Sequence, residues 1–306
     1  MMAEAIQKGS AGISELQGRV VAVTGAARGM GRAMVTGFLA EGAKVVAMDV
    51  SWDPTGFSGD SDDAFLKELQ GRQDNVLVST VDISDGPAVE ASYQATMDKF
   101  GTVDALVNNA GLRQRNLFPP TGKITTLETK DSDWEKMFGV GVFGTLKVTR
   151  KFIQPMLERQ SGSVISVISG GAMHTAVGGA YVAQRSSSRE MPYQSAKAAT
   201  LTMMFYLADE VQESNVAVNI LIPGNARTTG YDEQNEARRT EGQTGSSNRP
   251  GRFSMTPEHI VPITLFLASQ DANTGITGKC FDVPTWNMEH GLGGPEAWRD
   301  PDANRA

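Results

Sequence analysis

Short apolar runs alternate with longer segments of helical periodicity along most of the chain, and this alternation restricts the fold more than any other feature. The runs are rich in Val, Ile and Ala and lack the polar alternation of a strand with one solvated face. Strands of this kind are buried on both faces, and helices between them make βαβ units of a parallel sheet. The predicted strands are Val20–Thr24, Lys44–Asp49, Val76–Asp82, Ala105–Asn108, Val164–Ile168, Ala217–Ile222 and Lys279–Val283.

Helical periodicity fills the segments between these strands. The first helix has an apolar stripe that Gly42 ends, formed by Met30, Met34, Val35, Phe38 and Leu39. The other predicted helices are Pro87–Phe100, Ser132–Glu158, Pro192–Glu213 and Pro257–Ser269. We find no internal repeat and no interdomain linker. The sequence therefore predicts one α/β domain, a doubly wound parallel sheet flanked by helices, at residues 18–286, with a flexible leader at residues 1–17 and an irregular segment at residues 287–306.

Three polar or glycine-containing segments interrupt this pattern, at Ser51–Asp74, Gly170–Met191 and Asn225–Met255. Loops of this length inside a domain are commonly functional lids or disordered segments. The second and third are expected to form the walls of a substrate pocket. Their larger apolar side chains indicate either an apolar alcohol or ketone as substrate or ordinary loop packing, and they are Met173, Tyr181, Met191 and Tyr231.

Charge and composition disfavour several classes of function. A net charge of −7 and the absence of a basic stripe argue against nucleic acid as a partner. No apolar run reaches the ~18 residues of a membrane-spanning helix, so no membrane partner is expected. The single cysteine, Cys280, suits a reducing compartment and a cytoplasmic location. The histidines His174, His259 and His290 lack the spacing of a zinc site, so no metal is expected.

A glycine-rich turn directly follows the first predicted strand. The motif T-G-A-A-R-G-M-G covers residues 24–31 and opens the first predicted helix. Glycines permit a sharp turn and let backbone amides approach a pyrophosphate at the helix N-terminus. An ordinary tight turn is the alternative, but the strand before the motif and the helix after it favour a dinucleotide site.

An acidic residue stands where a dinucleotide site needs one. Asp49 ends the second predicted strand, 18 residues after Gly31. A carboxylate there accepts hydrogen bonds from the adenosine ribose and repels a 2′-phosphate, although the other role open to Asp49 is that of a capping or turn residue. Arg28 complicates the choice of cofactor, because a guanidinium near the ribose pairs well with a phosphate. We predict NAD, with NADP as the less favoured cofactor.

Further motifs resemble the short-chain dehydrogenase/reductase family from about Gly18 to Thr285. In the family's order they are Asp82-Ile83, N-N-A-G at residues 108–111, Ser169, Tyr193 with Lys197, P-G-N-A-R-T at residues 223–228, and Thr277-Gly278. The resemblance implies a Rossmann-type fold and hydride transfer between a nicotinamide cofactor and a secondary alcohol or ketone. It implies Ser169, Tyr193 and Lys197 as catalytic residues. The implied cofactor contacts are Gly25, Arg28, Gly29, Met30, Gly31, Asp49, Asp82, Ile83, Asn109, Gly111, Tyr193, Lys197, Ala226 and Thr228.

The residue types suit proton transfer beside a hydride. A tyrosine with its unperturbed pKa of ~10 is a poor base near neutrality. Lys197 follows Tyr193 by four residues, which places both on one helical face, and its positive charge favours the phenolate. By resemblance Lys197 also holds the nicotinamide ribose. Ser169 would donate a hydrogen bond to the substrate oxygen, in the manner of an oxyanion stabiliser.

Other assignments of these roles remain open in the sequence. Tyr181 is followed by Arg185 at the same spacing as the proposed pair. Arginine does not readily give up a proton, and Pro192 directly before Tyr193 is typical of a helix start, so we favour Tyr193. Ser169 has a loop or capping role as its alternative, since Ser166 also lies near the end of that strand.

One residue departs from the family pattern. The family carries an asparagine on the helix after the fourth strand, where it holds a proton-relaying water, and Gly141 stands at that place. Glycine offers no side chain and costs a helix interior ~1 kcal/mol relative to alanine. We predict that backbone carbonyls and a water keep the relay. A non-catalytic dinucleotide-binding sensor or scaffold is the alternative function.

An unbroken apolar run, residues 203–207, lies in the predicted Pro192–Glu213 helix. A helix that is apolar all round is buried on more than one side. By resemblance, we expect a homotetramer or homodimer built on this helix and on Ser132–Glu158.

Overall fold

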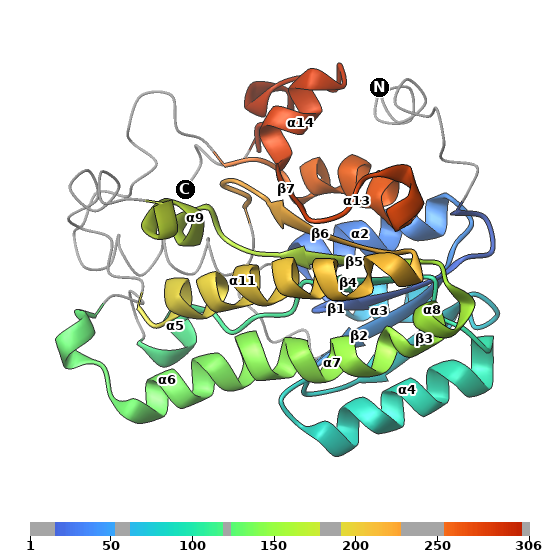
Figure 1. Ribbon diagram of the computed structural model, residues 1–306, viewed down its shortest axis with the longest axis horizontal. Helices are drawn as coiled ribbons and strands as arrows, with labels where there is room; N and C mark the ends of the chain where they lie inside the picture. The colour runs from blue at the N-terminus through green and yellow to red at the C-terminus, as the bar shows by residue number, and fades with distance from the viewer. Residues whose placement is uncertain (1–15, 53–61, 119–123, 178–190, 228–253, 302–306) are drawn as a thin grey trace.

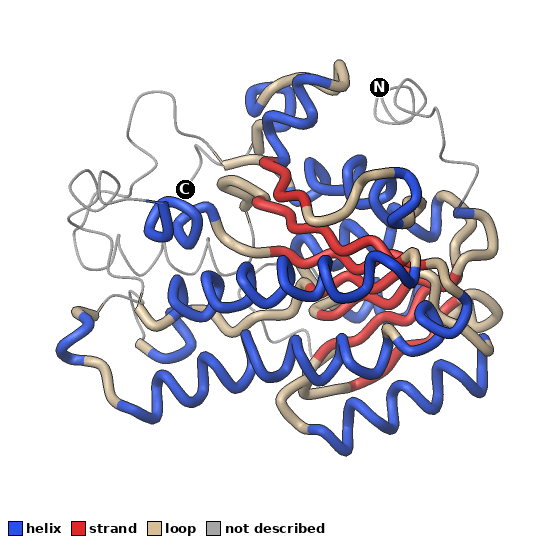
Figure 2. Tube along the Cα trace, viewed as in Figure 1, coloured by secondary structure: helices blue, strands red, loops and turns tan. Residues whose placement is uncertain are grey.

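A seven-stranded parallel sheet forms the centre of the computed structural model, which describes residues 16–52, 62–118, 124–177, 191–227 and 254–301 (Figures 1 and 2). The strand order is β3-β2-β1-β4-β5-β6-β7, and neighbouring strands are parallel. The strands are β1 (Val20–Thr24), β2 (Lys44–Asp49), β3 (Val76–Thr80), β4 (Ala105–Asn108), β5 (Gly162–Val167), β6 (Val216–Ile222) and β7 (Lys279–Asp282). Because the order runs outward from β1 in both directions, the predicted doubly wound, Rossmann-type fold is confirmed.

Helices cover both faces of the sheet and bury its side chains in two apolar clusters (Figure 1). β1, β4 and β5 are buried along their whole length, as expected for strands without polar alternation. One face is covered by α2 (Gly29–Ala40), α3 (Asp62–Gln70) and α13 (Val261–Ala268), and the other by α4 (Gly86–Phe100), α7 (Thr145–Phe152) and α11 (Tyr193–Val211). Among the helices that the structure describes, none is long and apolar enough to cross a membrane.

The predicted helix at Ser132–Glu158 is divided into four segments. They are α6 (Asp131–Phe138), a π-helical segment (Gly139–Gly144), α7 (Thr145–Phe152) and α8 (Gln154–Arg159). The π segment coincides with three glycines, whose missing side chains remove the packing that favours regular α-helix. Pro155 lies at the start of α8, where a proline is tolerated but cannot continue the preceding helix. The predicted helix is therefore confirmed as a helical run over residues 131–152 with a π segment inside it, while the part beyond Ile153 is a separate short helix.

Short helices occur where the sequence predicted irregular structure. α3 lies within the predicted Ser51–Asp74 loop, α9 (Gly170–Val177) opens the Gly170–Met191 segment, and α5 (Gln114–Leu117) follows β4. The last strand ends at Asp282, because the Asp282 side chain caps a helix by accepting from Thr285 N at 3.1 Å. That helix, α14, runs over Val283–Glu289. The remaining short turns are 3₁₀ helices at Thr126–Glu128, Gln212–Ser214, Pro257–Ile260, Ala272–Thr274 and Pro295–Trp298.

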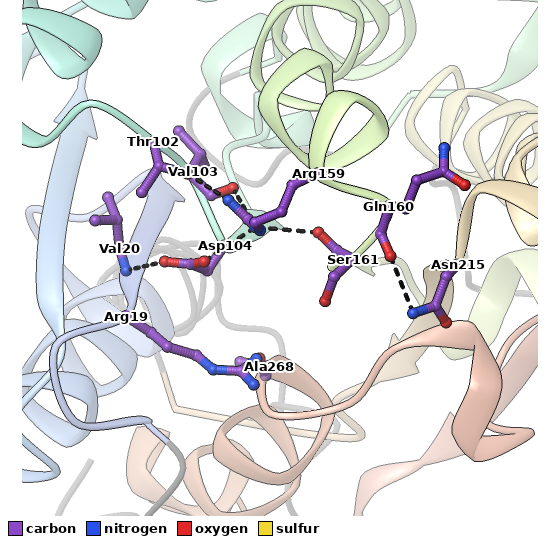
Figure 3. Close-up of polar contacts among 10 residues, drawn as sticks. All are labelled: Arg19, Val20, Thr102, Val103, Asp104, Arg159, Gln160, Ser161, Asn215 and Ala268. Atoms are coloured by element: carbon purple, nitrogen blue, oxygen red, sulfur yellow. Dashed lines mark hydrogen bonds and ion pairs between the residues drawn. The ribbon is translucent and has the colours of Figure 1, made fainter.

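Paired charges join the amino ends of the central strands (Figure 3). Asp104 Oδ2 accepts from Val20 N at 2.7 Å, which ties the start of β4 to the start of β1. Arg159 Nη2 lies 2.9 Å from Asp104 Oδ1 and donates to the carbonyls of Val103 and Ser161 at 3.2 and 3.0 Å. One ion pair thus links β1, β4, α8 and the start of β5.

Candidate functional site

Close packing around the predicted dinucleotide turn requires glycine. Gly25 and Gly29 have φ angles of +67° and +54°, in the left-handed region that favours glycine. A Cβ on Gly31 would lie 1.8 Å from Gly25 O, and one on Gly25 would lie 2.9 Å from the Cα of Ala110. The turn therefore packs directly on the start of α2 and on the loop after β4. This arrangement fits a dinucleotide, because it leaves the N-terminus of α2 beside backbone that side chains do not crowd.

The loop after β4 holds the glycine turn in place. Thr24 Oγ1 accepts from the backbone N–H groups of Asn109 and Ala110, each at 3.0 Å. Asn109 Nδ2 donates to Thr24 O at 3.0 Å and to Gly25 O at 3.1 Å. Within the structure, Asn109 therefore shapes the turn through the backbone of β1.

The predicted adenosine residues lie at the ends of β2 and β3. Asp49 Oδ2 accepts from Ala27 N at 2.9 Å, inside the glycine turn, and Asp49 Oδ1 accepts from Ser51 N at 3.3 Å. Asp82 accepts from the backbone N–H and the hydroxyl of Ser84 at 2.8 and 2.7 Å. Ile83 is buried next to the π segment. Asp49 is thus the acidic side chain that directly contacts the turn.

The predicted catalytic pair lies in the first turn of α11. Tyr193 is the first residue of this helix. The Lys197 side chain is only 8% exposed, and its Nζ donates to Val167 O at 2.9 Å and lies 6.0 Å from the centroid of the Tyr193 ring. Burial lowers the pKa of Lys197 from its usual 10.5 to about 8. Below that pH the site contains a buried cation close to the tyrosine.

Two other segments reach the same turn of α11. A Cβ on Gly111 would lie 3.6 Å from Lys197 Nζ, and one on Gly171 would lie 2.5 Å from Gln194 Nε2. Gly171 is two residues after Ser169, which itself follows β5 and precedes α9. The structure therefore brings the segment that carries Ser169 against the start of α11. Thr228 and the alternative base Tyr181 lie outside the described residues.

The Gly141 carbonyl faces hydroxyl groups. It accepts from Thr145 Oγ1 and from Thr200 Oγ1, each at 2.9 Å. The single proton of the Thr200 hydroxyl is shared between this carbonyl and Ala196 O, which lies 3.0 Å from Thr200 Oγ1. The relay predicted from the sequence uses a water on backbone carbonyls of this helix, and at the Gly141 carbonyl such a water would compete with these hydroxyls. A Cβ on Gly141 would lie 3.4 Å from the Cβ of Ala196, an ordinary contact.

Sequence reasoning missed a contact made by the C-terminal segment. We call it the clasp: residues 225–227, 254–256 and 298–300. Its backbone is joined by four hydrogen bonds, Met255 N to Asn225 O, Arg227 N to Met255 O, Thr256 N to Trp298 O and Asp300 N to Ser254 O, of 2.7 to 2.9 Å. Arg227 Nη1 lies 3.1 and 3.2 Å from the two carboxylate oxygens of Asp300. The clasp fixes the backbone beside Ala226, one of the predicted cofactor residues.

The described residues offer neither a metal site nor a reactive thiol. Among them, no cluster of His, Cys, Asp and Glu is arranged to hold a metal ion. Cys280 lies on the edge strand β7, and burial raises the pKa of its thiol to about 11. A thiol with that pKa is protonated near neutrality and is a poor nucleophile.

Comparison with known proteins places this fold among oxidoreductases that use a nicotinamide dinucleotide. A family model described as short chain dehydrogenase matches residues 19–239. The chain belongs to the short-chain dehydrogenase/reductase family, as its motifs predicted.

Relatives support this assignment. Fluoren-9-ol dehydrogenase of Terrabacter sp. (strain DBF63) is 48% identical over 94% of this chain and 76% of its own length. The subunit BbsD of (2S)-((R)-hydroxy(phenyl)methyl)succinyl-CoA dehydrogenase of Thauera aromatica is 30% identical over 88% of this chain and 96% of its own. A crystal structure of a short-chain dehydrogenase/reductase from Burkholderia xenovorans has a TM-score of 0.69 at 24% identity, over 88% of this chain and 95% of its own, and supports the fold.

Proposed function

We propose that the chain is an NAD-dependent dehydrogenase of secondary alcohols that carry an aromatic ring on the carbinol carbon. Tyr193 is its general acid/base. The observation that carries the proposal is the first turn of α11, where the buried Lys197 ammonium lies 6.0 Å from the Tyr193 ring. Ser169 follows the strand whose Val167 carbonyl binds that ammonium.

The proposed mechanism moves one proton at Tyr193. A bound nicotinamide would supply the acceptor for the hydride that leaves the carbinol carbon. The Tyr193 phenolate accepts the hydroxyl proton of the alcohol, and the cation of Lys197 favours this phenolate below the lysine pKa of about 8. The hydroxyl of Ser169 donates to the substrate oxygen and orients it. In the opposite direction, the Tyr193 hydroxyl returns its proton to the ketone oxygen.

The cofactor is proposed to be NAD rather than NADP. The residues of the glycine turn and Asp49 would hold its adenosine end, Asp82 and Ile83 would flank the adenine, and Lys197 would bind the nicotinamide ribose. The support for NAD is the Asp49 carboxylate, which contacts Ala27 N within the turn and would repel a 2′-phosphate.

Substitution of Asp49 tests this choice. We expect Asp49→Ala to reduce the preference for NAD over NADP, as a ratio of kcat/KM values, by about 10- to 100-fold, because it removes a charge repulsion and a ribose acceptor. Asp85→Ala, on the exposed loop before α4, serves as the control and should leave the ratio unchanged. A wild-type preference for NADP would contradict the assignment and point to Arg28.

The substrate class is inferred from two relatives whose names specify alcohols of one kind. Fluoren-9-ol and the hydroxy(phenyl)methyl group both place the hydroxyl on a carbon bonded to an aromatic ring. Oxidation of such a carbon gives a ketone conjugated with the ring. The apolar side chains of Met173 and Met191, both partly buried at the edges of the site, suit a substrate of this kind.

A comparison of four substrates tests the proposal. Fluoren-9-ol, 1-phenylethanol, cyclohexanol and a 3-hydroxyacyl thioester are each incubated with NAD, and nicotinamide reduction is followed by absorbance. We expect fluoren-9-ol to have the highest kcat/KM, by about tenfold or more over cyclohexanol, because rings add apolar burial. Turnover of the thioester alone would favour the activity of another relative, a 3-oxoacyl-(acyl-carrier-protein) reductase of Thermotoga maritima, which is 29% identical over 88% of this chain and 97% of its own length.

The second candidate is a dinucleotide-binding sensor or scaffold, which Gly141 favours. This residue lacks the side chain of the family's relay, and its carbonyl is already bound by Thr145 and Thr200. Binding of NAD without turnover of any of the four substrates would support this candidate. Retention of Tyr193, Lys197 and Ser169 together supports the enzyme.

A homodimer or homotetramer in the cytoplasm completes the proposal. Three aromatic side chains on the helices expected at the interface are exposed in the single chain: Phe143, Phe205 and Tyr206, at 55%, 38% and 70%. Assembly along these helices would cover them. The cytoplasmic location rests on the single cysteine, Cys280.

A further inference from the structure

We propose that Gln114 is a positioning residue for Tyr193. Its side-chain amide holds the backbone on both sides of Pro192 and thereby sets where the phenol of Tyr193 lies. This inference rests on the proposed catalytic role of Tyr193. It assigns a function to a residue that no motif of the sequence singles out.

The Gln114 amide bridges two residues that lie far along the chain. Gln114 opens α5 and is 8% exposed. Its Nε2 donates to Met191 O, and its Oε1 accepts from Tyr193 N at 3.4 Å. A carbonyl only accepts and a backbone N–H only donates, so a single orientation of the amide satisfies both groups. The two contacts therefore depend on each other.

The side chain of Gln114 supplies a hydrogen-bond acceptor at the start of α11. The first N–H groups of a helix have no partner within the helix. Pro192 occupies the capping position and makes no side-chain hydrogen bond to the helix. Gln114, 79 residues earlier, provides the acceptor for Tyr193 N. The catalytic tyrosine is thus held by the loop after β4.

The same loop meets α11 at a second point. Gly111, three residues before Gln114, lies opposite Lys197, where an added Cβ would be 3.6 Å from Nζ. Tyr193 and Lys197 are one helical turn apart. The loop therefore contacts α11 at both members of the pair, by close packing at Lys197 and by hydrogen bonds at Tyr193. Loss of the Gln114 hydrogen bonds would release the backbone at Tyr193 and leave the packing at Lys197 in place.

Substitution of Gln114 by Leu removes both hydrogen bonds and keeps a similar side-chain size. We expect kcat to fall about 10- to 30-fold, since a displacement of ~1 Å at a reacting group costs up to ~10²-fold. NAD affinity should stay within a few-fold, because the glycine turn and Asp49, which would hold the adenosine end, do not contact Gln114. The acidic limb of the kcat–pH profile should move to higher pH, because a displaced Tyr193 is less well stabilised as phenolate by Lys197.

Two matched variants separate positioning from general destabilisation. A protonated Glu retains both a donor and an acceptor, whereas an ionised Glu only accepts. Gln114→Glu should therefore approach wild-type kcat at low pH and lose it as the carboxyl ionises. Gln270→Leu is the control, because Gln270 also donates to a backbone carbonyl, Phe266 O at 3.0 Å, but at the end of α13. Its kcat and pH profile should not change.

The outcomes distinguish this inference from the proposed function. Wild-type turnover and its loss in Tyr193→Phe test the proposed function. With both established, a Gln114→Leu variant with unchanged kcat and unchanged pH limb would overturn the inference. If no substrate turns over, ultraviolet titration gives the pKa of the Tyr193 phenol, with Tyr193→Phe to identify its band. A raised pKa in Gln114→Leu supports the positioning role, and an unchanged one overturns it.

Discussion

Charged side chains are arranged differently at the two ends of the parallel sheet. At the amino ends, the Asp104 carboxylate and the Arg159 guanidinium are 2.9 Å apart, and both also bind backbone groups (Figure 3). At the carboxyl ends, Lys197 is buried against Val167 O, and in the part of the chain that the structure describes no carboxylate pairs with it. An ion pair of opposite charges thus joins strands at the amino ends, whereas a single buried cation lies beside Tyr193 at the carboxyl ends.

We expect the amino ends of the strands to contribute mainly to stability and the carboxyl ends mainly to catalysis. At the amino ends the charges are partly exposed and each has partners, so neither carries the full cost of desolvation. An unpaired buried charge, in contrast, destabilises the fold. The unpaired charge of Lys197 lies where a negative phenolate is needed, 6.0 Å from the tyrosine ring. Substitutions at the amino ends should therefore change stability without changing kcat. Substitutions at the carboxyl ends should change kcat, and some should even stabilise the protein.

Tyr193→Phe should have the largest effect on activity and almost none on the fold. We expect kcat to fall at least ~10³-fold, because the variant has no group to exchange the proton. Its melting temperature should stay within about 2 °C and its affinity for NAD within a few-fold, since only a hydroxyl is lost. Steady-state kinetics and thermal melting measure both. Full activity here, with Tyr181→Phe inactive instead, would mean that the wrong tyrosine was chosen.

Asp104→Ala should show the opposite pattern. The free energy of unfolding should fall by about 1–3 kcal/mol, mainly because the N–H of the buried Val20 loses its acceptor. Loss of the ion pair adds little, since the Arg159 side chain is 37% exposed. Denaturant unfolding measures this loss, and kcat in the folded protein should stay within about twofold. Glu90→Ala, which breaks the exposed pair with Lys151, is the control and should cost less than about 1 kcal/mol. A large loss of kcat in Asp104→Ala would contradict the inference that the amino ends of the strands affect stability and not catalysis.

Lys197→Met should abolish turnover and stabilise the protein. In the folded chain the pKa of Lys197 is about 8 instead of 10.5, so below pH 8 the fold bears the cost of a buried ammonium. That cost is about 3 kcal/mol, and loss of the bond to Val167 O offsets about 1 kcal/mol of it. We therefore expect a gain of about 2 kcal/mol at pH 7.

The pH dependence of this gain is the sharper measurement. Between about pH 8 and pH 10.5 the unfolded wild-type chain binds more protons than the folded one, so wild-type stability rises with pH. The advantage of Lys197→Met should shrink over that window. Lys67→Met, on the exposed side of α3, should show no such change. An advantage that is constant across the window would show that the ammonium is not responsible.

The smallest effects are expected at Gly141. Gly141→Ala should stabilise the protein by up to about 1 kcal/mol, because alanine loses less backbone freedom and its Cβ meets Ala196 at an acceptable 3.4 Å. Gly141→Asn should lower kcat a few-fold, since its larger side chain must displace neighbours of α11. Kinetics at several buffer concentrations test this. A several-fold gain in kcat, with less dependence on buffer, would show instead that the wild-type relay is merely weakened.

Patterns carried by neighbouring residues were predictable from the sequence. The strands are continuous apolar runs, and β1, β2 and β4 have the bounds that those runs predicted. The glycine turn was also predictable, because positive φ angles at Gly25 and Gly29 and close packing at Gly31 leave few alternatives. The place of Asp49 beside the turn was predictable from its distance of 18 residues after Gly31.

Features that depend on distant contacts were not predictable. Gln114 and Asp300 are ordinary polar residues until the fold places them beside Tyr193 and Arg227. Their roles arise from separations of 79 and 73 residues, and local pattern contains no information about such pairs.

The clasp also bears on the order in which parts of the cofactor site can form during synthesis on the ribosome. The turn at Gly25 and the acid at Asp49 belong to the first part of the chain to be synthesised, whereas Arg227 must wait for Asp300, 73 residues later. At ~5–20 residues per second that interval is roughly 4–15 s. The residues of the adenosine end are therefore synthesised well before the clasp can form. Their helix α2 packs against α13, so both ends of the site depend on the last part of the chain.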